Sequence, residues 1–129
     1  MAATVHYEKA PDLQERIREI VTHEHFNFVK PDQLHVFRST GSKARAYARI
    51  YAMPHIWQLA LDIDPHYCLE FISEKFNRLS QEDQTKVVIH ELMHIPKTFS
   101  GALVPHRGRG RRHQVTHQTV DQLFKLIFG

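Results

Sequence analysis

Two histidines and a glutamate, His90, Glu91 and His94, form an HExxH pattern within an apolar stretch of this 129-residue chain. Residues four apart lie on the same face of an α-helix, so the two imidazoles can bind one zinc ion from a rigid base. The glutamate between them can handle the proton of a water molecule that the metal activates. These residue types at this spacing therefore indicate metal-dependent hydrolysis.

The flanking residues favour a helix with one buried side around this pattern. Ser80 is a good N-cap with acidic residues after it, and Pro96 is expected to end the helix just after His94. Four apolar residues lie on the arc away from the histidines: Val88, Ile89, Leu92 and Ile95. The alternative is a helix that carries two histidines by chance, whose buried imidazole and carboxylate groups would need other partners.

A catalytic zinc site needs a third protein ligand and an open position, so a later histidine is expected. Ser100 stands where the shorter HExxHxxGxxH pattern has its last histidine, so the chain must take a longer excursion. His106 is the preferred candidate, because residues 99–106 can turn back at Gly101 and bring His106 to the metal. Pro105 would hold the loop that carries His106.

His113 and His117 are the other candidates for the third ligand. They are also four residues apart, and one of them can instead point into the cleft and donate a hydrogen bond to a developing oxyanion. Either one can also close the coordination sphere as a fourth ligand. Such a site would be structural rather than catalytic.

The second half of the chain carries a longer pattern: Phe71-Ile-Ser-Glu-Lys-Phe76, His90-Glu-Leu-Met-His-Ile-Pro96, Phe99-Ser-Gly101 and Leu103-Val-Pro-His106. This pattern resembles the zincin-like metallopeptidases, and more closely the small metallopeptidases of archaea and phages that are related to SprT-like proteins. The resemblance implies that one zinc ion is held by three histidines and that Glu91 is the general base. The implied ligands are His90, His94 and His106.

The composition is that of one globular domain spanning residues 1–129, with 42% hydrophobic and 24% charged residues. No apolar run approaches 18 residues, and no charged-then-apolar leader begins the chain, so neither a membrane span nor a secretory signal is expected. The single Cys68 cannot form an internal disulfide, which agrees with a reducing compartment. We therefore expect a cytoplasmic protein.

The positive charge of the chain is concentrated in one segment. Four arginines lie within six residues: Arg107, Arg109, Arg111 and Arg112. Without them the formal net charge falls from +3 to −1. One interpretation is an electrostatic guide for acidic peptides or nucleic acid near the metal, and the other is a solvated loop without a dedicated partner.

Hydrophobic periodicity predicts an α+β fold, with a sheet of three or four strands, an N-terminal helix, the HExxH helix and a C-terminal helix. The expected helices run from Pro11 to about Glu24, from Ser80 to about Pro96, and from about Val115. The expected strands are Leu34–Arg38, Arg45–Tyr51, Ile56–Leu61 and Tyr67–Ile72.

The favoured function is a zinc-dependent metallopeptidase whose extended peptide substrate adds along an exposed sheet edge. That binding mode fails if a helix or loop covers the edge. One alternative is a zinc hydrolase of another substrate such as RNA, because activated water also attacks phosphate. The other is a non-enzymatic, zinc-stabilised module that binds nucleic acid.

Overall fold

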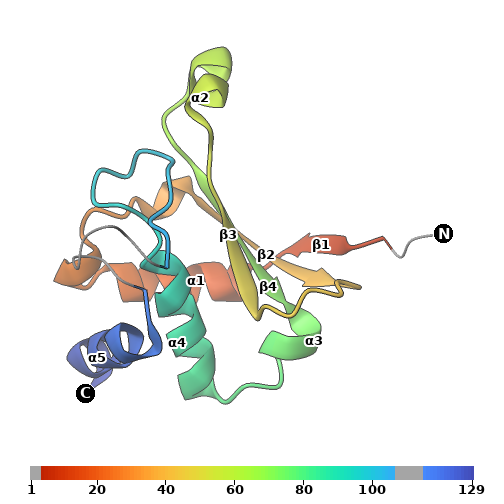
Figure 1. Ribbon diagram of the computed structural model, residues 1–129, viewed down its shortest axis with the longest axis vertical. Coiled ribbons are helices and arrows are strands. Elements are labelled where there is room, and N and C mark those ends of the chain that lie inside the picture. The colour runs from red at the N-terminus through yellow and green to blue at the C-terminus, as the bar shows by residue number, and fades with distance from the viewer. Residues whose placement is uncertain (1–3, 107–114) are drawn as a thin grey trace.

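A computed structural model describes residues 4–106 and 115–129, and a four-stranded mixed sheet lies at the centre of this described part. The strand order is β1-β2-β4-β3 (Figure 1). β2 and β4 run parallel, and each outer strand runs antiparallel to its neighbour. The strands are β1 His6–Lys9, β2 Leu34–Thr40, β3 Ala48–Tyr51 and β4 Tyr67–Ile72. This sheet confirms the predicted α+β class.

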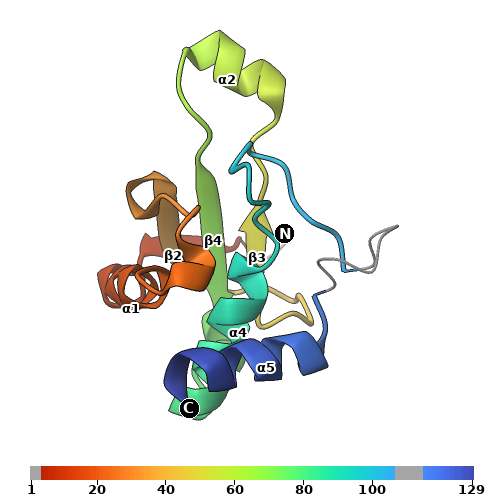
Figure 2. The same ribbon diagram turned by 90° about the vertical axis from the view of Figure 1, so that its left-hand side faces the viewer.

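Helix α1 packs against β2 and α4 lies beside β3 (Figure 2). The helices are α1 Pro11–Val21, α2 His55–Leu61, α3 Ser73–Phe76, α4 Gln81–Leu92 and α5 His117–Phe128, and the short 3-10 helices are η1 Glu24–Phe26 and η2 Pro31–Gln33. Because successive strand residues point to opposite faces, Tyr67, Leu69 and Phe71 of β4 all enter the core, each at most 1% exposed.

Among the described residues, no helix has both the length and the apolar composition that crossing a membrane requires.

Helix α4 begins at the predicted cap. The Ser80 hydroxyl accepts a hydrogen bond from the Asp83 N–H, which satisfies a donor that the first turn of a helix leaves free. The four apolar residues on the arc away from the histidines are each at most 2% exposed: Val88, Ile89, Leu92 and Ile95. The predicted apolar side of this helix is therefore confirmed.

The end of α4 differs from the expectation. The helix ends at Leu92, so His94 lies in the following turn rather than in the helix. The N–H groups of His94 and Ile95 bond to carbonyls only three residues back, which tightens the chain. Pro96 disfavours helical geometry at the residue before it, so the helix stops earlier than the spacing predicted.

The predicted strand Ile56–Leu61 is wrong, because these residues belong to helix α2. The strand was expected because an apolar run follows the turn at Pro54, but a short apolar run has no periodicity that separates a strand from a helix. Instead, α2 projects from the sheet (Figure 1), and its apolar side chains are exposed, including Trp57 at 56% and Leu59 at 65%. Asp62, with a φ of 54°, ends the helix in the left-handed region.

Several element boundaries differ from the expectation, and one strand was not predicted. The N-terminal helix ends at Val21 instead of Glu24, and β3 starts at Ala48 instead of Arg45. β1 was not predicted, because its four residues are all exposed and show no apolar alternation. Residues 6–9 form a strand because they pair with β2, and their own sequence has no pattern that predicts one.

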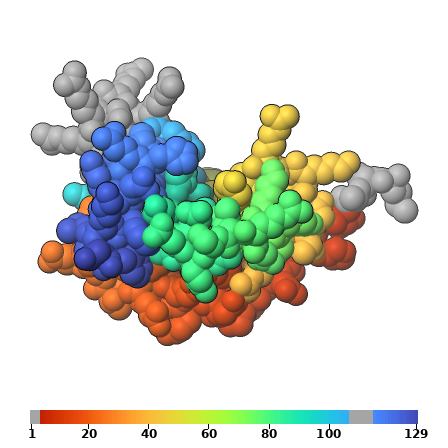
Figure 3. All heavy atoms as spheres, turned by 90° about the horizontal axis from the view of Figure 1, so that it is seen from below, coloured from red at the N-terminus to blue at the C-terminus, as the bar shows by residue number. Residues whose placement is uncertain are grey.

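The predicted C-terminal helix is present as α5, which lies directly against α4 (Figure 3). Thr116 caps it, and the side chains of Thr116 and Thr119 each accept a hydrogen bond from the other's N–H. Val120 and Leu123 are buried in the interface side of α5. Lys86 of α4 also forms a 3.2 Å ion pair with Asp121.

We expect Leu92→Ala to lower the free energy of unfolding by about 2–5 kcal/mol, since it leaves a cavity in the core. Leu59→Ala on α2 is the matched control, and its effect should stay within about 0.5 kcal/mol because this leucine is exposed. Urea denaturation of both variants measures the difference. Equal losses of stability would contradict the placement of these two leucines.

Candidate metal centre

The two histidines of the HExxH pattern lie one turn apart on the cavity side of α4 and the turn after it. Their ring centroids are 5.1 Å apart. His90 is partly exposed, and His94 is 6% exposed. The buried arc of α4 holds the backbone from the opposite side, so the two imidazoles share one rigid support.

His106 reaches these histidines through a loop that is fastened to the fold. The Tyr67 hydroxyl donates to the Ala102 carbonyl and accepts from the Gly101 N–H, both at 2.8 Å. Gly101 has a φ of 94°, and a Cβ there would lie 2.6 Å from the Met53 carbonyl oxygen. Only glycine fits such a close approach, so the chain turns back at Gly101 as the sequence predicted.

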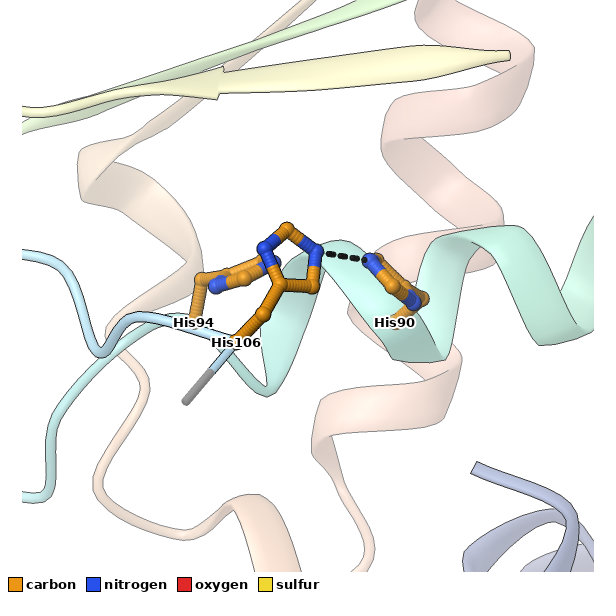
Figure 4. A group of neighbouring side chains, drawn as sticks. All are labelled: His90, His94 and His106. Atoms are coloured by element: carbon orange, nitrogen blue, oxygen red, sulfur yellow. Dashed lines mark hydrogen bonds between the residues drawn. The ribbon is translucent and has the colours of Figure 1, made fainter. Parts of the chain in front are cut away.

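The structure brings His90, His94 and His106 into one cluster (Figure 4). One nitrogen from each ring lies within 4.8 Å of the other two. The Nε2 atoms of His90 and His106 are 3.1 Å apart. Two imidazole nitrogens bound to one tetrahedral zinc ion are separated by about 3.3 Å, so this spacing fits a metal site.

Hydrogen bonding orients the His94 ring toward this cluster. The Val104 carbonyl lies 2.5 Å from His94 Nδ1, and a carbonyl only accepts, so Nδ1 carries the proton. Nε2 then keeps its lone pair for a metal ion. The Val104 N–H also donates to the His94 carbonyl at 2.7 Å, which ties the loop that carries His106 to the turn after α4.

Burial keeps these imidazoles in the form that binds metal. Burial, followed by the neighbouring His94 and His106, lowers the pKa of His90 to about 4. Burial also lowers the pKa of His94, against the opposing effect of its bond to Val104. Both rings are therefore neutral at pH 7, and a neutral imidazole does not have to lose a proton before it binds a metal ion.

Glu91 lies in the wall of the same site and is 7% exposed. Its Oε2 atom is 3.8 Å from His90 Nε2. Burial raises the pKa of Glu91 to about 8, because the charged carboxylate loses its hydration. A carboxyl group whose pKa lies near neutrality can both accept and release a proton under ordinary conditions.

A cavity of about 890 Å³ opens in front of these residues, between β3, α4, α5 and residues 103–106. Five polar side chains on its wall come from the HExxH region or from the later candidates: His90, Glu91, His94, His106 and His117. The edge strand β3 forms the opposite wall. The cavity is large enough for several residues of an extended peptide.

The other predicted candidates have different outcomes. His117 lines the cavity, but it is not a member of the three-histidine cluster. His113 and the four arginines lie outside the described residues: Arg107, Arg109, Arg111 and Arg112. Sequence reasoning missed Tyr67, whose hydroxyl contacts residues 34 and 35 positions later, because nothing local marks such a contact.

We expect His94→Ala to weaken binding of Zn²⁺ or Co²⁺ by more than about 100-fold, since losing an outer-shell partner alone costs 10- to 100-fold. His55→Ala is the control, because His55 is exposed on α2 and lies outside the cluster. Calorimetric titration of metal-free protein measures both affinities. Wild-type affinity in the His94 variant would exclude this cluster as the metal site.

Comparison with known proteins finds one family match. A family model described as "Putative phage metallopeptidase" matches residues 5–125. Neither a curated protein nor a solved structure matches the chain. The resemblance noted in the sequence rests on the second half of the chain. The family match extends well beyond that half, and it includes the HExxH residues and His106. This chain therefore belongs to the phage metallopeptidase family.

Proposed function

We propose that this protein is a zinc-dependent metallopeptidase. In this proposal His90, His94 and His106 bind one zinc ion, and Glu91 is the general base. The observation that carries the proposal is the convergence of three imidazole nitrogens beside a buried carboxylate in one cavity. Imidazole suits zinc among the divalent ions, and membership of the metallopeptidase family supports the reaction class.

The number of ligands favours catalysis over a structural metal. Structural zinc sites are closed by four protein ligands, whereas catalytic sites have three and leave one position open. Among the described residues, no fourth histidine, cysteine or carboxylate joins the three-histidine cluster. The cluster also faces a cavity that can admit a substrate. This arrangement favours an enzyme over a metal-stabilised binding module.

The chemistry divides between the metal and Glu91. A bound zinc ion supplies Lewis acidity, which polarises a carbonyl group and makes water nucleophilic near neutral pH. Glu91 accepts the proton that the attacking water loses, and it then delivers a proton to the amine that leaves. Its position next to His90 places the carboxylate beside the ligand cluster, as this transfer requires.

Within the described part of the chain, β3 is an edge strand, and its outer edge can orient an extended substrate. The Ile72 N–H donates to the Tyr47 carbonyl, so Tyr47 and every second residue after it bond to β4. The main-chain groups of Ala48 and Ile50 therefore point to the free edge, and both residues line the cavity. A peptide that pairs with them gains hydrogen bonds that do not depend on its side chains.

We expect Glu91→Gln to lower kcat for peptide hydrolysis by about 10²- to 10⁴-fold, because the amide cannot take a proton from water. Zinc content should be unchanged, since Glu91 is not in the ligand cluster. Glu15→Gln on the exposed side of α1 is the control. The same proteins are assayed on RNA, and loss of RNA cleavage without loss of peptide cleavage would refute the proposal.

Substrates that carry single N-methyl groups test the pairing with β3. Methylation removes a main-chain donor, so kcat/KM should fall about 5- to 10-fold at alternate positions away from the cleaved bond. Methylation of the terminal residue of the same peptide is the control. Uniform cleavage at all positions away from the scissile bond would show that the strand edge does not bind the substrate.

A further inference from the structure

His117 occupies a defined place in the wall of the cavity. It is the first residue of α5, and the reciprocal hydrogen bonds of Thr116 and Thr119 fix the start of this helix. The cavity that His117 lines is the one that contains Glu91 and His106. Because α5 is also held to α4, the position of His117 is set by packed helices and not by a free loop.

The contact between α4 and α5 brings His117 and His90 to the same cavity. Lys86 and Asp121 form an ion pair of 3.2 Å between the two helices. His90 comes one turn after Lys86, and His117 comes one turn before Asp121, so each histidine lies one turn from this ion pair on its own helix. Their proximity is also evident in the pKa of His90, since His117 is one of the charges that lower it.

His117 is near the cluster without belonging to it. Its ring nitrogens are not within the 4.8 Å group formed by His90, His94 and His106. Among the described residues, no hydrogen bond or ion pair engages the exposed His117 ring. An imidazole always retains at least one N–H, so His117 presents an uncommitted donor to the cavity next to the ligands.

We propose that His117 donates a hydrogen bond to the carbonyl oxygen of the scissile peptide and stabilises the negative charge that develops there. This inference rests on the proposed peptidase function. When water adds to the carbonyl carbon, the electron pair of the C=O π bond moves onto oxygen, and a donor aimed at that oxygen lowers the barrier. His117 keeps its proton throughout, because Glu91 carries the proton from water to the leaving nitrogen.

The test compares His117→Ala with His117→Gln, which retains an N–H donor, and with Gln118→Ala as control. Gln118 is exposed on the same turn and does not line the cavity. We expect kcat to fall by about 10²- to 10³-fold in His117→Ala with little change in KM, because the interaction forms only as charge develops. His117→Gln should recover part of this loss, and Gln118→Ala should retain wild-type kcat.

A second readout does not depend on turnover. A phosphinic peptide presents anionic oxygens in a tetrahedral arrangement, and its affinity for the zinc-loaded protein should fall in His117→Ala by a factor similar to that in kcat. Zinc affinity, measured separately by calorimetry, should stay at the wild-type value. Circular dichroism of each variant verifies that α5 remains folded.

The outcomes separate this inference from the proposed function. A wild-type protein that binds zinc but neither cleaves peptides nor binds the phosphinic peptide would overturn both. An active wild-type enzyme whose kcat and phosphinic affinity are unaffected by His117→Ala would overturn only the role of His117. Zinc affinity that falls more than about tenfold in His117→Ala would show that His117 is a ligand, and the inference would also be wrong.

Discussion

The packing of α4 between the sheet and α5 is the constraint on which the rest of the site depends. Val88, Ile89 and Leu92 are fully buried on one side of this helix, while His90 and Glu91 meet the cavity on the other. A helix buried along one side cannot rotate without exposing that side to water, which would cost about 25 cal/mol per Å². The direction of the HExxH residues is thus a consequence of core packing.

The third histidine depends on a different part of the fold. Tyr67, at the start of β4 and 1% exposed, bonds to two main-chain groups of the loop that leads to His106. Val104 of this loop bonds to His94 through both its N–H and its carbonyl. The sheet therefore positions the loop, and the loop in turn orients a histidine that belongs to the α4 region. Three imidazole groups from separate elements are thereby brought together in one cluster.

The electrostatics of the site follow from this burial. Burial lowers the pKa of His90 and of His94, and it raises the pKa of Glu91. In each case the charged form is disfavoured, because the cavity wall provides less solvation than water. A divalent cation would bind imidazoles that are already neutral. Its charge would also offset the cost of burying a charged carboxylate at Glu91. The same packing that shapes the cluster therefore makes it more receptive to a cation.

Local sequence by itself determined the HExxH residues, the Ser80 cap and the apolar side of α4, because helix periodicity and capping act within a few residues. Only the tertiary structure decided that His106, and not His117, joins the two HExxH histidines, since that choice depends on contacts of Tyr67 with residues more than 30 positions away. Dependence on distant residues also explains why α2 was predicted as a strand and why β1 was not predicted. An apolar run such as residues 56–61 fits a strand or a helix equally well, and an exposed edge strand is formed by its partner, so long-range packing settles both.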